Sequence, residues 1–131
     1  MKDFIRTMKA LSDPNRVKTV MMLKERRMCV CELTAALGVS QPTVSNHLKV
    51  LEDAGLVESA KEGPWVNYFI PAAPPPCAKE LLDGMDALLA GDPGIRMLQG
   101  SLEGIRREDL CSPRRGAKAS SGESKAVGKA G

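Results

Sequence analysis

Hydrophobic positions along this chain repeat at two spacings, and the change from one to the other separates helical from extended segments. Apolar residues recur every three or four positions within residues 4–11, 17–23, 33–37, 44–51, 81–89 and 95–105, which predicts helices. In the stretch 57–70, Val57, Val66, Tyr68 and Ile70 suit strands, and residues 61–64 suit the turn between two strands. The pattern therefore predicts a mainly α protein with a small β-hairpin.

Boundary residues place two of the predicted helices close together in the middle of the chain. A short segment over 30–37 ends at Gly38, a suitable helix C-cap, and Ser40 is a suitable N-cap for a helix over 41–53. This arrangement is a helix-turn-helix, and the hairpin that follows it directly is typical of a winged helix. The apolar stripe Val44, Leu48 and Leu51 would face the core.

The remaining positions of the second helix carry side chains that hydrogen-bond base edges and phosphates. We therefore expect this helix and the turn of the hairpin to contact DNA. His47, the one histidine in the chain, lies in the same helix and suits either a phosphate contact or a packing contact. The candidate DNA-binding residues are Gln41, Thr43, Ser45, Asn46, His47, Lys49 and the hairpin residue Lys61.

The net charge of +3 is distributed unevenly over the 131 residues. Residues 112–131 carry five basic residues and one acidic residue, a net +4, so the rest of the chain is close to neutral at −1. DNA binding must then depend on local placement of charge. We expect a folded domain over 1–111 and a disordered basic tail over 112–131, because the tail is rich in Gly, Ser, Ala and Lys and has no periodicity.

Several functional classes receive no support from the sequence. No apolar run approaches the roughly 18 residues that span a bilayer, and no signal-peptide core is visible, so we expect a cytoplasmic protein with reduced cysteines. A Gly-rich phosphate loop and a nucleophile–His–Asp set are also missing, which argues against an enzyme. We expect no constitutive cofactor.

Cys29 and Cys31, in the stretch "MCVCEL", are the candidate metal-binding residues. On a regular helix, side chains two positions apart point about 200° away from each other. Thiolates that share one thiophilic ion must come within about 3.5–4 Å, given metal–sulfur bonds of roughly 2.3 Å. Ligand capture by this pair should therefore unwind the start of the helix that supports the DNA-reading helix, which would couple the two events.

The segments "CVCEL", "LGVSQPTVSNHLKVLEDAGLV" and "GPWVNYFI" together resemble the ArsR/SmtB family of metalloregulatory repressors, and most of all its arsenical-resistance repressors. The resemblance covers about residues 4–90. It implies a homodimeric winged helix that binds an inverted-repeat operator, with the first and the C-terminal helices at the dimer interface. It also implies release from DNA when As(III) or Sb(III) binds Cys29 and Cys31.

One position departs from the resemblance. Close relatives often carry a third cysteine where this chain has Thr34, so Cys77 and Cys111 are the candidate third ligands, although each is more simply an incidental cysteine. Two alternatives stay open on the same DNA-binding fold, a cadmium or lead sensor and a thiol-redox sensor. A zinc sensor is disfavoured because residues 77–90 contain no histidine.

Overall fold

The computed structural model describes residues 1–110, so Cys111 and the expected basic tail over 112–131 lie outside the described residues. The elements follow in the order α1 (Lys2–Ala10), α2 (Pro14–Glu25), α3 (Val30–Leu37), α4 (Gln41–Asp53), β1 (Glu58–Glu62), β2 (Trp65–Phe69), α5 (Pro76–Leu89), α6 (Pro93–Ser101), the 3₁₀ turn η1 (Leu102–Gly104) and α7 (Arg107–Leu110). The predicted mainly helical fold with one antiparallel hairpin is confirmed.

Local capping explains where α2 and α4 begin and where α3 ends. The Asp13 side chain accepts hydrogen bonds from the backbone N–H groups of Asn15 and Arg16 at 2.8 and 3.2 Å, which fixes the start of α2. The Ser40 hydroxyl accepts from the N–H of Thr43 at 3.3 Å at the start of α4. Gly38 ends α3 in the left-handed region, with φ of 71°, as the sequence predicts.

The hairpin is longer than predicted and its turn is shorter. Register pairs run from Glu58 opposite Phe69 to Glu62 opposite Trp65, so the two central positions of the turn are Gly63 and Pro64. The expected turn over 61–64 is therefore wrong for its first two residues. Gly63 has φ of 65°, as the first central position of a type II′ turn requires, and this lets the ladder continue to the tip of the hairpin.

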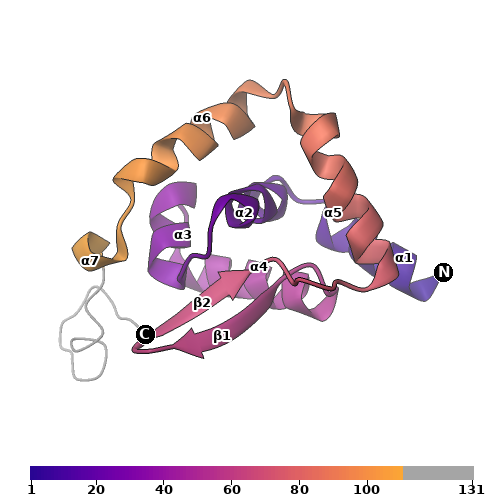
Figure 1. Cartoon of the computed structure of the whole chain (residues 1–131), viewed down its shortest axis with the longest axis horizontal. Helices are drawn as coiled ribbons and strands as arrows, with labels where there is room; N and C mark the ends of the chain where they lie inside the picture. The colour runs from indigo at the N-terminus through magenta and orange to yellow at the C-terminus, as the bar shows by residue number, and fades with distance from the viewer. Residues whose placement is uncertain (111–131) are drawn as a thin grey trace.

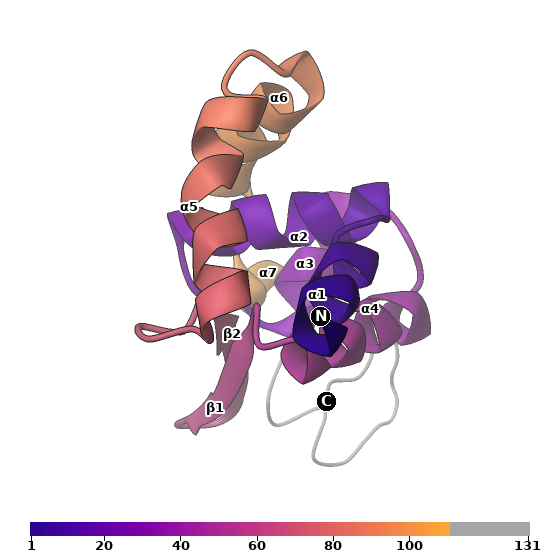
Figure 2. The same cartoon turned by 90° about the vertical axis from the view of Figure 1, so that its right-hand side faces the viewer.

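The helices enclose an aliphatic core around α2 (Figures 1 and 2). The α5 and α6 helices form an arch on one side of α2, while α4 and the hairpin lie together on the opposite side in both views. The largest fully buried apolar side chains are Met22, Met28, Leu33, Leu48, Leu51 and Leu56. They include Leu48 and Leu51 of the stripe predicted to face the core. No helix within residues 1–110 is long and apolar enough to cross a membrane.

The C-terminal segment differs from the sequence-based expectation of one helix over 95–105. The α6 helix ends at Ser101, and a 3₁₀ turn and an extended Ile105 separate it from α7. Gly100 and Gly104 lower helix propensity at this point by about 1 kcal/mol each relative to alanine. Ile95 and Leu102 are 5% exposed and belong to the chain's own core, and α6 packs against α2.

Candidate ligand site and nucleic-acid interface

Cys29 and Cys31 lie on the two sides of a helix boundary. Cys29 is the N-cap of α3 and has extended backbone angles, φ −91° and ψ 172°, while Cys31 is the second residue of the helix. The 200° separation expected on a regular helix therefore does not apply to this pair. The Cys31 side chain is a hydrogen-bonding neighbour of the Cys29 thiol, so the two thiols lie close together across this boundary, and the distortion of α3 expected on ligand capture stays a prediction.

The surroundings of Cys29 favour its thiolate form. The hydrogen bond from Cys31 is the largest influence and lowers the pKa of the Cys29 thiol, and it outweighs the opposing effect of burial. The backbone N–H of Glu32 and the positive charge of Arg107 also lower this pKa, whereas the negative charge of the Glu32 carboxylate raises it. Because the thiolate is the form that binds metals, this environment favours binding of soft, thiophilic ions.

Glu32 completes a capping box in which a cysteine takes the usual place of serine or threonine. The Cys29 backbone N–H donates to Glu32 Oε1 at 3.0 Å, and the Cys29 side chain accepts from the backbone of Glu32 in return. Glu32 is only 1% exposed, and its carboxylate is paired with Arg26 at 3.1 Å and with Arg107 at 3.4 Å. The ligand site therefore lies directly against an ion cluster whose carboxylate, Glu32, is buried.

Met28, the residue before the cysteine pair, is hydrogen-bonded to the hairpin through its backbone. Tyr68 of β2 donates its backbone N–H to the carbonyl of Met28 at 2.8 Å, and Met28 donates back to the carbonyl of Tyr68 at 3.2 Å. Met28 is fully buried. The backbone that leads into Cys29 thus acts as a short third strand beside β2, and a shift of this backbone would act on the hairpin.

The structure supplies no third sulfur next to the pair among residues 1–110. Cys77 lies in the first turn of α5, and no group of three or more His, Cys, Asp or Glu side chains within residues 1–110 could hold a metal ion. Cys111 lies outside the described residues. Thr34, one turn after Cys31, has a buried hydroxyl Oγ1 with no hydrogen-bond partner within the described chain.

The candidate DNA-binding residues divide into an outer set and one inner residue. Most of them, Thr43, Ser45, Asn46, Lys49 and Lys61, are exposed, and Gln41 is half-buried at the start of α4. His47 is 8% exposed and lies on the inner face of α4, where its Nδ1 is 3.3 Å from Arg16 Nη1. Of the two roles expected for His47, this position favours the packing contact, and its role toward DNA stays a prediction.

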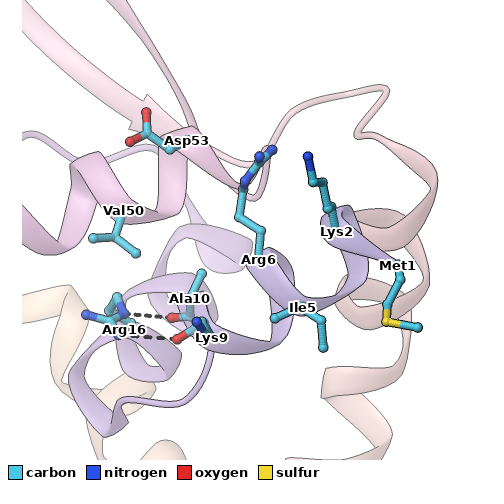
Figure 3. Close-up of a pocket in the computed structure, with 9 residues that line it drawn as sticks. All are labelled: Met1, Lys2, Ile5, Arg6, Lys9, Ala10, Arg16, Val50 and Asp53. Atoms are coloured by element: carbon cyan, nitrogen blue, oxygen red, sulfur yellow. Dashed lines mark hydrogen bonds between the residues drawn. The ribbon is translucent and has the colours of Figure 1, made fainter.

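A groove of about 750 Å³ runs between α1 and α4 (Figure 3). Arg16 closes one end of it by donating to the backbone carbonyls of Ala10 at 2.7 Å and Lys9 at 3.3 Å. The groove adjoins the exposed apolar side chains of α1, which are Phe4, Ile5 and Met8 at 42–49% exposure. This side of the domain is suited to protein–protein contact more than to DNA.

Sequence reasoning missed the charged residues around the cysteines. Glu32 was detectable, because a carboxylate at the third helical position after a cap is the capping-box signature, with Cys29 standing in for serine. Arg26, Arg107 and Trp65 carry no local signal. Arg26 pairs with Glu32 six positions later, whereas Arg107 reaches Glu32 across 75 positions.

Comparison with known proteins agrees with this arrangement. The description "bacterial regulatory protein, arsR family" matches residues 13–59, which include the helix-turn-helix and the cysteine pair. The chain is 39% identical over 80 residues to the arsenical resistance operon repressor of Escherichia coli (strain K12), a match that covers 60% of this chain and 68% of that protein.

Two further similarities bear on the fold and on the ligand. The chain is 43% identical over 63 residues to the cadmium resistance transcriptional regulatory protein CadC of Listeria innocua, covering 47% of this chain and 53% of that protein. The crystal structure of the transcriptional repressor BigR from Xylella fastidiosa aligns with a TM-score of 0.58 at 30% identity, covering 66% of this chain and 83% of that one.

Proposed function

The chain belongs to the ArsR family of bacterial regulatory proteins, and we propose that it is a homodimeric repressor released from operator DNA by trivalent arsenic or antimony at Cys29 and Cys31. The family membership makes it a DNA-binding transcriptional repressor and not an enzyme. The ligand, its two cysteine ligands and the mode of release are the proposal. They rest on one observation, the two cysteines placed on either side of the start of α3, with Cys29 as its extended N-cap and Cys31 as its second residue.

The donor set at this position fits a thiophilic metalloid. Arsenous acid, As(OH)₃, would exchange two of its hydroxides for the sulfurs of Cys29 and Cys31. Each thiol proton leaves with one hydroxide as water, so two As–S bonds form, two As–O bonds break and one hydroxide stays on arsenic. Thiolate sulfur is the protein ligand that soft ions prefer.

The position of the pair supports a coupling to DNA. The α3 helix is the first helix of the helix-turn-helix and packs against α4, the proposed reading helix. A ligand that holds both sulfurs constrains the backbone on the two sides of the α3 start. Ligand and operator would then favour different conformations of one element, and allosteric coupling requires only about 1–3 kcal/mol of such a difference.

Operator binding requires two copies of the reading helix about one helical turn of DNA, ~34 Å, apart. The exposed apolar face of α1, with Phe4, Ile5 and Met8, lies beside α5 on one side of the domain and supports pairing of two subunits there. We expect Phe4→Glu to shift the protein from dimer to monomer in light scattering. Val66→Glu in the hairpin, where Val66 is 46% exposed and lies outside the expected interface, is the control and should remain dimeric.

The decisive experiment measures release of a fluorescent operator fragment as arsenite is added. Wild type should dissociate, whereas Cys29→Ser and Cys31→Ser should keep nearly wild-type operator affinity in the absence of arsenite and should not respond to it. Cys77→Ser provides the matched control, because Cys77 lies at the start of α5. Normal arsenite release from either of the two pair mutants would contradict the proposal.

A cadmium or lead sensor is the second candidate, favoured by the similarity to the cadmium resistance regulator. Parallel titrations of the operator complex with arsenite and Cd²⁺ separate the two. We expect arsenite to release DNA at a lower concentration than Cd²⁺. A thiol-redox sensor is the third, and release by peroxide without release by arsenite would favour it. The contact between the two thiols is compatible with all three kinds of sensor. A disulfide between cysteines two positions apart would be strained, which disfavours the redox sensor.

A further inference from the structure

An ion cluster centred on the buried Glu32 connects the start of α3 with the C-terminal end of the described chain. Glu32 Oε1 accepts the backbone N–H of Cys29 at 3.0 Å and lies 3.4 Å from Arg107 Nη2. Glu32 Oε2 accepts from Arg26 Nη1 at 3.1 Å. Since Glu32 is 1% exposed, its charge depends on these partners and not on water for compensation.

Arg107 connects this cluster to the hairpin. Its guanidinium lies over the ring of Trp65, 4.8 Å from the ring centroid, and its side chain is 16% exposed. Trp65 is the first residue of β2 and pairs with Glu62 at the tip of the hairpin, close to the exposed Lys61. One arginine thus contacts the carboxylate that caps the cysteine site and the aromatic ring at the base of the hairpin turn.

The segment that carries Arg107 is held by the same cluster. Arg26 Nη2 donates to the backbone carbonyls of Leu102 and Ile105 at 3.2 and 2.8 Å, and α7 packs against α3 (Figure 1). The position of α7 therefore depends on Arg26 and Glu32. Movement of either would displace the Arg107 guanidinium from Trp65.

We infer that Glu32 and Arg107 form a relay that transmits ligand occupancy at Cys29 to the hairpin through Trp65. The inference rests on the proposed function for the identity of the ligand. A ligand held by both cysteines moves the Cys29 backbone and so weakens the hydrogen bond from the Cys29 N–H to Glu32 Oε1. This change in turn alters the ion pair between Glu32 and Arg107. Arg107 then leaves the Trp65 ring, and the hairpin loses the contact that fixes its tip.

Trp65 is the only tryptophan in the chain, so its fluorescence reports directly on this contact. The experiment records Trp65 emission, arsenite binding and operator affinity, each without and with arsenite, and repeats them with Cd²⁺ as a second thiophilic probe. The coupling is the ratio of operator Kd values with and without the probe, roughly 5- to 150-fold in allosteric proteins.

The test variant is Arg107→Gln and its matched control is Arg106→Gln, which removes the same charge from an exposed neighbour whose side chain pairs, within residues 1–110, with Glu108 at 3.9 Å. Wild type and Arg106→Gln should show a change in emission and full coupling. Arg107→Gln should bind arsenite within a few-fold of wild type, with emission already altered before arsenite is added and a coupling ratio close to one.

Two conservative variants distinguish a relay from a general loss of structure. Arg107→Lys keeps a positive charge for Glu32 but lacks the planar face that stacks on the ring, so it should lose most of the Trp65 response. Trp65→Phe keeps an aromatic ring and should retain coupling, while Trp65→Ala should lose it. Thermal melts establish that each variant is folded.

The outcomes separate this inference from the function on which it rests. Wild-type coupling in Arg107→Gln, with arsenite or with Cd²⁺, overturns the relay and leaves the thiol sensor intact. Failure of wild type to bind either probe overturns the proposed sensor and the relay together. Loss of coupling in Arg106→Gln to the same extent as in Arg107→Gln also overturns the relay, because the effect would then be one of charge alone.

Discussion

Arg16 Nη1 lies 3.3 Å from Nδ1 of His47, a contact that joins the first turn of α2 to the inner face of α4. The same arginine donates to the carbonyl of Ala10 at 2.7 Å, so one side chain holds α1, α2 and α4 together. His47 therefore lies on the inner face of the reading helix, and we expect it to orient this helix and not to contact DNA.

The first prediction concerns His47. We expect His47→Ala to lower the free energy of unfolding by about 1–2 kcal/mol, because it opens a small cavity and removes a buried hydrogen bond. The preference for operator over altered operators should stay the same, since no base contact is lost. Urea unfolding and competition binding measure the two quantities, and a change in base preference would show that His47 reads DNA after all.

The second prediction concerns base reading by α4. Gln41→Ala and Ser45→Ala should each weaken operator binding by about 1–3 kcal/mol if the side chain contacts a base. Fluorescence anisotropy with operator and with unrelated DNA separates specific from general loss. Ala87→Ser, at an exposed position on α5, is the control. Equal loss on both DNA sequences would argue for a phosphate contact.

The third prediction concerns charge. Lys49→Ala and Lys61→Ala should each reduce the slope of log Kd against log salt by about one, because each removes one phosphate contact. Arg96→Gln on α6, which lies on the side of the molecule away from α4 and the hairpin, should leave the slope unchanged (Figure 2). The total slope of log Kd should be shallower than the roughly +10 of a heavily basic repressor. A monomeric footprint on one half-site would contradict the dimeric mode of binding.

The fourth prediction concerns the third position on arsenic. Cys77→Ser and Cys111→Ser should each retain arsenite-induced release within a few-fold of wild type, and X-ray absorption should find two protein sulfurs on arsenic. Thr34→Cys should add a third, because the Thr34 Oγ1 is buried one turn after Cys31 without a hydrogen-bond partner in the described chain. Three sulfurs in wild type, lost in one of the serine variants, would show that the site extends further along the chain.

The fifth prediction concerns pH and the cap of α2. Burial acts to raise the pKa of Asp13, but hydrogen bonds from the backbone N–H groups of Arg16 and Asn15 outweigh it and hold this pKa below its ordinary 3.8. The stabilisation is therefore present above pH 3.8 and is lost as the pH falls through the lower folded-state pKa. Asp13→Ala should cost about 0.5–2 kcal/mol at neutral pH. The difference from wild type should shrink in acid, and a constant difference in urea melts would refute the carboxylate's role.

The sequence by itself determined the features that depend on neighbours along the chain. Helix periodicity, the Asp13 and Ser40 caps and the left-handed Gly38 all follow from interactions within a few residues, so the helix-turn-helix was predictable almost to the residue. The neighbouring positions of Cys29 and Cys31 were also local, and the helix predicted over 30–37 starts between them, as the structure confirms. That start depends on Glu32, which closes the capping box at Cys29.

Only the tertiary structure decided which side chains meet across long separations. Arg107 finds Glu32 across 75 positions and Trp65 on another element, and no periodicity in either segment indicates such a contact. Spacing alone is compatible with His47 facing either DNA or the core. In the structure the His47 side chain lies against Arg16 on the inner face of α4. The fold thus surrounds a locally encoded thiol pair with charges from distant segments, because a buried carboxylate such as Glu32 must find its partners wherever the packing brings them.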